Sequence, residues 1–267
     1  MRALLTGGKR MPDLEPMPTP QRMTLSAQVA RHLVDLISRE SLKPGDLVPS
    51  EVQICRGLQV SRGSAREAYC ALAALGILEV GNGRRPRLQT INSHVLAQVF
   101  GYALSTAQLD PSHVVETRRA IEVQGVQLAA RHASEEHKRI LRDLVGTMRE
   151  ALGDPDHLRL MQADIAMHTT LAEASRNPLN TLLLAALREP LQKLMLIDLG
   201  SRRSEAELVR IVDAHGRIVE RVCAGDAEGA RAAMADHFDL SFASMPDASS
   251  WDGNGNDTSA ASFGRAT

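Results

Sequence analysis

The sequence predicts a mainly α-helical protein: an N-terminal winged helix-turn-helix, with three helices and a β-hairpin, followed by an all-α antiparallel bundle of six or seven helices. Three observations predict this fold. Apolar residues recur with helical spacing over most of the 267 residues. Only 3% of residues are aromatic, so the core must be aliphatic, and such a composition favours helices. A glycine- and arginine-rich turn between two short strand-like runs interrupts the helices once, in the stretch "GNGRRP".

Changes in composition predict four segments along the chain. Residues 1–22 are expected to be a disordered leader, because their apolar stretch is too short for a signal peptide. We expect the winged helix-turn-helix domain at 23–91 and the helical domain at 92–245. Residues 246–267, rich in Gly, Ser, Asn and Asp, are expected to be a disordered tail. No apolar run approaches the roughly 20 residues that span a bilayer, so we expect no membrane partner.

Charge is distributed unevenly between the two predicted domains, although the formal net charge of the chain is only −1. Residues 21–90 carry 10 Lys and Arg against 6 Asp and Glu, a net of +4. Residues 91–245 carry 17 against 21, a net of −4. The basic first unit indicates a nucleic-acid partner. The three cysteines have no metal-type spacing and are typical of reduced thiols in a cytoplasmic protein.

Sequence signals for helix starts and ends predict the order of elements in the N-terminal domain. A first helix begins near Thr24, and the prolines and glycine of "LKPGDLVPS" end it. Ser50 and Gln53 form a predicted capping box for a short second helix. A third helix starts near Ser61 and stops at Gly76. Its predicted core face is Ala65, Ala68, Leu72 and Leu75. The runs "ILEV" and "RLQT" then flank the basic turn, which completes a winged helix-turn-helix plan.

Caps mark the starts of the later helices. Three pairs place a cap residue before a proline at the first helical position: Asp110-Pro111, Asp154-Pro155 and Asn177-Pro178. Ser204 and Glu207 form another predicted capping box. The connections are short, so neighbouring helices should run antiparallel.

The stretch "PGDLVPSEVQICRGLQVSRGSAREAYCALAALGILEV" resembles the DNA-binding domain of the GntR family of bacterial transcription regulators. The shared features are a Pro-Gly…Pro-Ser-Glu opening, a Val-Ser-Arg…Arg-Glu-Ala recognition helix and a Leu…Gly-hydrophobic end. The resemblance implies contacts with DNA from the start of the third helix and from the wing tip: Ser61, Arg62, Ser64, Arg66, Gly83 and Arg84. Family members commonly carry Arg directly after Pro-Ser-Glu, where this chain has Val52, so one DNA contact expected from the resemblance is missing.

The chemistry of these residues agrees with the resemblance. A recognition helix presents its N-terminal end to base edges, where Arg pairs bidentately with guanine and Ser binds phosphate or base. The wing arginines, Arg84, Arg85 and Arg87, suit phosphates or the minor groove. Isolated arginines on a helix are usually only solvated; their place in this motif favours the interpretation as DNA contacts.

Three later stretches resemble the FCD domain, the effector-binding domain of the FadR subfamily of these regulators: "ETRRAIEVQGVQLAARHAS", "ADIAMHTTLAEASRNPL" and "DAHGRIVERVCAGDAEGARAAMADHF". In metal-binding FCD domains one Asp and three His hold the ion. The resemblance implies Asp164, His168, His215 and His237 as the metal ligands. We expect a divalent transition metal, zinc first, with Ni, Mn or Fe as alternatives.

The spacing of these four residues is compatible with a metal site. Asp164 and His168, four residues apart, lie on one helix face. His215 and His237 fall on two helices joined by a short connection. Taken alone, the Asp164/His168 pair is more readily explained as a surface pair or as a hydrogen-bonded core pair than as half of a metal site. The other histidines are interpreted as structural or surface residues: His32, His94, His113, His132, His137 and His157.

Arg118 matches the family arginine that commonly faces the carboxylate of the bound effector. A guanidinium is the natural partner of an acid group. The alternative interpretation is a helix salt bridge from Arg118 to Glu122.

Together these observations predict a cytoplasmic homodimeric repressor, not an enzyme, that binds a palindromic operator and responds to a small carboxylate effector such as a hydroxy acid or a sugar acid. Activation is the alternative to repression. One rival is a metal-responsive regulator in which the ion is the signal. Another is a metalloenzyme that uses the Asp/His site to activate water. A third is a constitutive DNA-binding dimer with a structural metal.

Overall fold

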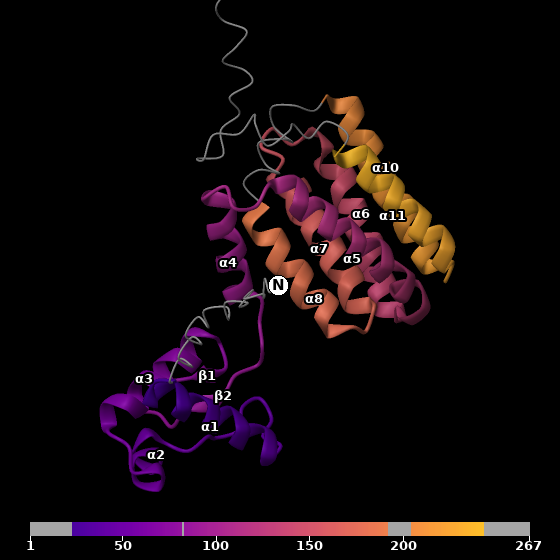
Figure 1. Ribbon diagram of the computed structural model, residues 1–267. Coiled ribbons are helices and arrows are strands. Elements are labelled where there is room, and N and C mark those ends of the chain that lie inside the picture. Colours follow the sequence, from indigo (N-terminus) through magenta and orange to yellow (C-terminus); the bar gives the residue numbers. More distant parts are fainter. Residues whose placement is uncertain (1–22, 82, 192–203, 243–267) are drawn as a thin grey trace, which may run out of the picture. The chain divides into compact units, whose positions relative to one another are not determined.

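The computed structural model of the chain describes residues 23–81, 83–191 and 204–242 (Figure 1). These residues form two compact units that divide after Thr90. The division predicted from the sequence falls one residue later, after Ile91. The predicted leader at 1–22 and the predicted tail at 246–267 lie outside the described residues.

The N-terminal unit contains three helices and a hairpin: α1 (Leu25–Arg39), α2 (Glu51–Leu58), α3 (Arg62–Ala74), β1 (Leu78–Glu79) and β2 (Arg87–Leu88). The predicted winged helix-turn-helix is therefore confirmed. Helices α1 and α2 both pack on α3. The buried residues of this unit form one core: Val29, Leu33, Val48, Ile54, Ala65, Ala68, Tyr69, Leu72 and Leu78.

Polar caps start the helices of this unit. The Ser50 side chain accepts a hydrogen bond from the Gln53 amide, and the Gln53 side chain accepts one from the Ser50 amide, so the predicted capping box is confirmed. The Ser61 Oγ accepts from the Ser64 amide at 3.1 Å. This cap fixes where α3 begins and therefore which residues stand at its N-terminal end.

The wing is an antiparallel hairpin in which Leu78 pairs with Leu88 and Glu79 with Arg87. Gly83 in the connecting turn has φ +72°, in the left-handed region that glycine enters without steric cost. The predicted core position of Leu75 is wrong, because this side chain is 59% exposed. Leu75 caps the C-terminus of α3, beyond the last turn that packs on the core.

The C-terminal unit is all-helical in its described part: α4 (His94–Ser105), α5 (Pro111–His132), α6 (Glu135–Glu150), α7 (Leu158–Ala174), α8 (Pro178–Arg188), α10 (Glu205–Cys223) and α11 (Ala227–Phe242), with short 3-10 helices η1 (Ala151–Gly153) and η2 (Glu189–Leu191). The described ranges thus hold seven α-helices in this unit, and the predicted all-helical domain is confirmed. None of the described helices is long and apolar enough to cross a membrane.

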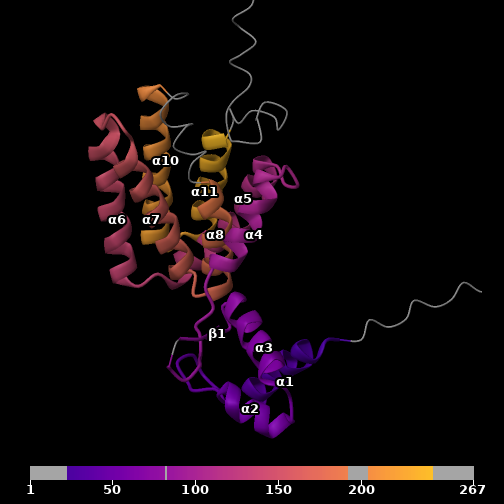
Figure 2. The same ribbon diagram turned by 90° about the vertical axis from the view of Figure 1, so that its left-hand side faces the viewer.

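Helix α5 is the central element of this unit, because it packs against α7, α8, α10 and α11 (Figure 1). Helix α6 lies beside α7 and α10 (Figure 2). Helix α4 packs on α8 and η2. Polar and charged side chains that reach inward from α5, α7, α8, α10 and α11 therefore meet in the interior of the bundle.

The predicted cap at Asp154 is wrong, whereas those at Asp110 and Ser204 are confirmed. Asp154 follows η1 with extended backbone, and α7 begins only at Leu158. The Asp156 side chain instead accepts a hydrogen bond from the Leu158 amide at 3.1 Å. An Asp-Pro pair also favours a turn, and here the turn precedes the helix by several residues.

Candidate functional site

Three histidines from three helices meet inside the C-terminal unit. His168 lies on α7, His215 on α10 and His237 on α11, and their side chains are buried. One ring nitrogen from each lies within 4.8 Å of the others. The His215 and His237 ring centroids are 4.3 Å apart. The antiparallel pair α10 and α11 therefore brings together two histidines that are distant in the sequence.

Asp164 joins this cluster from the turn of α7 that precedes His168. Its Oδ1 lies 3.0 Å from the His215 Nε2 and 3.6 Å from the His168 Nε2. Its Oδ2 is buried without a hydrogen-bond partner and lies 3.5 Å from Arg188 Nη1. Burial raises the pKa of Asp164, but Arg188 and His168 outweigh it and hold that pKa well below its usual value. The carboxylate is therefore ionised.

Further polar residues orient two of the rings. The Nδ1 of His168 contacts the Glu122 carboxylate of α5, which directs the His168 Nε2 toward Asp164 and the other histidines. The Nδ1 of His237 lies 3.3 Å from the Ser241 Oγ. A carboxylate behind a histidine is the usual support of a metal-ligating ring.

The cluster fits a transition-metal ion by its own chemistry. The Nδ1 of His215 is buried without a hydrogen-bond partner among the described residues, and its Nε2 contacts only Asp164 Oδ1. Burial lowers the pKa of His215 and of His237, so both rings are neutral and can donate a lone pair. Unpaired buried acceptors are costly unless a cation satisfies them. Three imidazole nitrogens and one carboxylate suit zinc and its first-row neighbours.

Two arginines lie beside the histidines. The sequence predicted a functional role for Arg118 but not for Arg188. Arg118 of α5 makes the ion pair with Glu122 that was the alternative interpretation, with Nη2 2.9 Å from Glu122 Oε1. Arg188, at the end of α8, is equally buried. A lone arginine at the end of the apolar run "LNTLLLAALR" was the available signal for it. The sequence alone did not show that this helix end points into the bundle.

The two arginines and the histidine cluster line a single cavity of about 60 Å³. Its other walls are mostly apolar: Leu160, Met161, Leu208, Ile211, Val212 and Phe242. A concave apolar site with a few converging polar groups is typical of small-molecule binding.

Zinc affinity should depend on pH through one histidine, not three. Burial lowers the pKa of His168, but Glu122 and Asp164 outweigh burial and raise it above its ordinary value near 6.5. The pKa of His215 and of His237 is lowered, so these rings hold no proton to lose near neutral pH. We expect zinc affinity to fall about tenfold per pH unit on acidification from pH 6.5 to 6.0, measured by chelator competition. A thousandfold change per unit, or none, would contradict this assignment.

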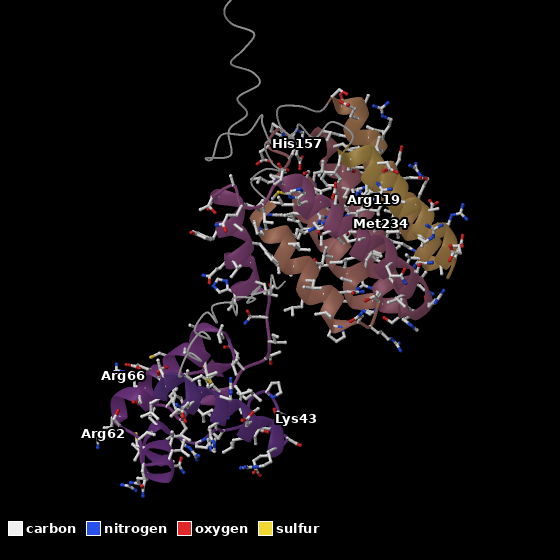
Figure 3. The ribbon with its side chains drawn as sticks, viewed as in Figure 1. Lys43, Arg62, Arg66, Arg119, His157 and Met234 are labelled. Atoms are coloured by element: carbon white, nitrogen blue, oxygen red, sulfur yellow. The ribbon has the colours of Figure 1, made fainter. Side chains whose placement is uncertain are left out.

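The predicted DNA-contact residues lie on the surface of the N-terminal unit. Arg62 and Arg66 are exposed on α3, and their side chains extend outward (Figure 3). Ser61 and Ser64 are joined through their hydroxyl groups at 3.0 Å. In the wing, Arg84 is exposed, whereas Arg87 donates to the Gly45 carbonyl at 2.6 Å. Val52, where the family commonly has Arg, is 51% exposed on α2.

Replacing Arg66 with alanine should weaken operator binding by about 1–3 kcal/mol, if the guanidinium reads a base edge. The change removes no buried contact, so the fold should be unaffected. Arg39→Ala, an exposed arginine at the end of α1 that pairs with Glu40, is the matched control. Fluorescence anisotropy with a duplex selected from a random-sequence pool measures the effect. Equal affinities for both variants would remove Arg66 from the DNA interface.

Comparison with known proteins matches a different domain family to each of the two units. The family model described as "Bacterial regulatory proteins, gntR family" matches residues 25–87, and the FCD domain model matches residues 113–240. The HTH-type transcriptional regulator LutR of Bacillus subtilis is 31% identical over 76% of this chain and 93% of its own length. A putative L-lactate dehydrogenase operon regulatory protein of Escherichia coli is 30% identical over 83% of this chain and 86% of its own.

Two further matches extend this comparison. The HTH-type transcriptional repressor NanR of Salmonella newport is 29% identical over 59% of this chain and 61% of its own length. A solved structure of Streptococcus agalactiae GntR superposes with a TM-score of 0.56 at 24% identity, covering 80% of this chain and 97% of that one, and thus shares the fold.

The chain is therefore a DNA-binding transcription regulator and not an enzyme. It belongs to the GntR family of bacterial regulators and carries an FCD domain.

Proposed function

We propose that the protein is a repressor that a small organic acid releases from its operator, and that the acid binds beside a metal ion in the FCD domain. Asp164, His168, His215 and His237 would hold the ion. The observation that carries the proposal is the meeting of three buried histidines and an ionised carboxylate at a cavity that also contains two buried arginines. A divalent metal held there supplies an open coordination position for a carboxylate or hydroxyl oxygen.

The cavity favours a short 2-hydroxy acid over a sugar acid. Its volume of about 60 Å³ accommodates about four or five water-sized groups, which is nearer to the size of a three-carbon hydroxy acid than to that of a six-carbon sugar acid. The name of the Escherichia coli relative refers to an L-lactate dehydrogenase operon. L-Lactate is therefore the first probe, and zinc the first ion to load. Arg118, which lines the cavity, contributes positive charge to the binding of the acid.

We propose further that the protein acts in the cytoplasm as a homodimer on a palindromic operator, because two recognition helices read two half-sites. Domains 23–91 and 92–245 would carry DNA binding and effector binding respectively. An acid can lower operator affinity only if it binds more tightly to the arrangement of the dimer that does not fit DNA. Repression in the absence of the acid agrees with the repressor named among the relatives.

A thermal-shift screen of zinc-loaded full-length protein tests this function. The probes are L-lactate, malate, succinate and gluconate, each repeated after chelation. An acid that binds the native state alone raises the melting temperature. A shift with lactate that disappears on chelation supports the proposal.

The same screen, together with operator affinity measured at several zinc and acid concentrations, separates the rival functions. If no acid shifts the melting temperature, the acid sensor is excluded for these compounds. Operator affinity that then follows the zinc concentration would support a metal-responsive regulator. Operator affinity that ignores both zinc and acid would leave the ion a structural role.

A further inference from the structure

The two buried arginines of the cavity differ in which of their hydrogen-bond donors are already used. A guanidinium offers a carboxylate one side edge made of Nε–H and an Nη2–H, which run parallel and match the two carboxylate oxygens. In Arg118 this edge is filled, and only Nη1 is buried without a hydrogen bond among the described residues. Its Nε and Nη2 both donate to Glu122 Oε1, at 3.0 and 2.9 Å.

In Arg188 the same edge has no partner. Its Nε and Nη2 are buried without a hydrogen bond among the described residues, and the residue as a whole is only 3% exposed, so water does not satisfy these donors. Its remaining nitrogen, Nη1, donates to the Asp164 carbonyl oxygen at 3.3 Å and lies 3.5 Å from the Asp164 Oδ2. The guanidinium is thus held by one nitrogen, with its bidentate edge unsatisfied.

Leaving two charged donors unpaired inside the protein is expensive, and an anionic ligand would satisfy both at once. Glu122 cannot serve Arg188 in this way, because its two oxygens are engaged by Arg118 and His168. Asp164 is engaged with His215 and with Arg188 Nη1. Among the described cavity residues, no carboxylate therefore remains for the Nε/Nη2 edge of Arg188.

We propose that Arg188, and not Arg118, binds the carboxylate of the effector through its Nε/Nη2 edge, while Arg118 is a positioning residue that holds Glu122 behind His168. This inference rests on the proposed acid-sensing function. It assigns the two ends of the ligand: the carboxylate lies at the end of α8, and the 2-hydroxyl group lies toward the histidine cluster. It differs from the expectation, taken from family resemblance, that Arg118 faces the carboxylate of the effector.

Matched lysine substitutions test the assignment. Arg→Lys keeps the positive charge beside Asp164 or Glu122 but removes the bidentate edge. Zinc-loaded full-length wild type, R188K, R118K and R119K are titrated with L-lactate and with L-lactamide, its neutral amide. Calorimetry gives the affinities, and elemental analysis gives the zinc content of each sample. Arg119 is the control, because it pairs with Asp239 and does not line the cavity.

We expect wild type to prefer lactate to lactamide, and R188K to reduce that preference about tenfold or more with its zinc retained. R118K and R119K should change the preference by less than about threefold. Loss of the preference in R118K, alone or to the same extent as in R188K, would overturn the assignment. Loss of zinc from R188K would also overturn it, by making Arg188 a support of the metal. Wild type that binds neither compound would instead refute the acid-sensing function itself.

Discussion

His215→Ala is expected to abolish the stabilisation of the protein by zinc. Wild type at a free zinc concentration of 100 times Kd should gain about 2.7 kcal/mol over the chelated protein, which is about 5–10 °C for a unit of this size. Loss of one of four ligands should weaken zinc binding about 100-fold or more, since changes behind a ligand already cost 10–100-fold. At the same zinc concentration the variant should then gain less than about 0.5 kcal/mol.

The geometry explains why His215 is the most informative ligand to remove. Its only polar contact among the described residues is that of Nε2 with Asp164 Oδ1, at 3.0 Å, so its removal costs the metal-free protein one such contact. The packing cost of the smaller side chain cancels, because each variant is compared with its own chelated form. His132→Ala, an exposed histidine at the end of α5, is the control and should keep the full zinc response. A full response in His215→Ala would exclude this histidine as a ligand.

Glu122→Leu is expected to destabilise the metal-free protein by about 3–5 kcal/mol. The Glu122 carboxylate is buried and joins Arg118 to His168. Two nearby cations, His168 and Arg118, outweigh its burial and lower its pKa, so it is ionised. Without it, Arg118 is left as an uncompensated charge in the core. Chemical unfolding with chelator present, followed by circular dichroism, measures the loss.

A double variant and an isosteric variant make this test specific. Arg118→Leu combined with Glu122→Leu strands no guanidinium, so its cost should be smaller than the sum of the single changes. Glu122→Gln keeps the shape but presents an amide N–H to the His168 Nδ1. That contact favours the tautomer whose Nε2 carries the proton, and zinc affinity should fall about 10–100-fold. A Glu122→Leu change below about 1 kcal/mol would show that Arg118 finds another partner.

Much of the fold could be predicted from local signals. The capping box at Ser50 and the Asp110-Pro111 start depend only on neighbouring residues, and both are confirmed. Asp154-Pro155 carries the same local signal and begins no helix, because Asp-Pro serves turns equally well. Leu75 has the periodicity of the α3 core face, yet α3 ends before it.

The candidate site was only partly predictable for a different reason. Asp164 and His168 share one helix turn, so their proximity follows from spacing alone. The prediction that His215 and His237 lie close to this pair came from family resemblance, because no local sequence rule places two helices against a third. Arg188 was missed since its role depends on where the end of α8 lies in the bundle. Whether Arg118 binds an effector or pairs with Glu122 also depends on tertiary structure. In the structure it forms the ion pair and also lines the cavity.

Operator release by L-lactate, with and without the metal, tests whether a metal-bound acid controls DNA binding. Full-length protein is bound to a labelled operator duplex, and fluorescence anisotropy is followed as lactate is added to zinc-loaded protein, to chelated protein and to His215→Ala. We predict release of the duplex from zinc-loaded wild type only, with lactamide inactive. Equal release from all three samples would contradict a metal-borne acid site, and no release from any of them would contradict acid sensing.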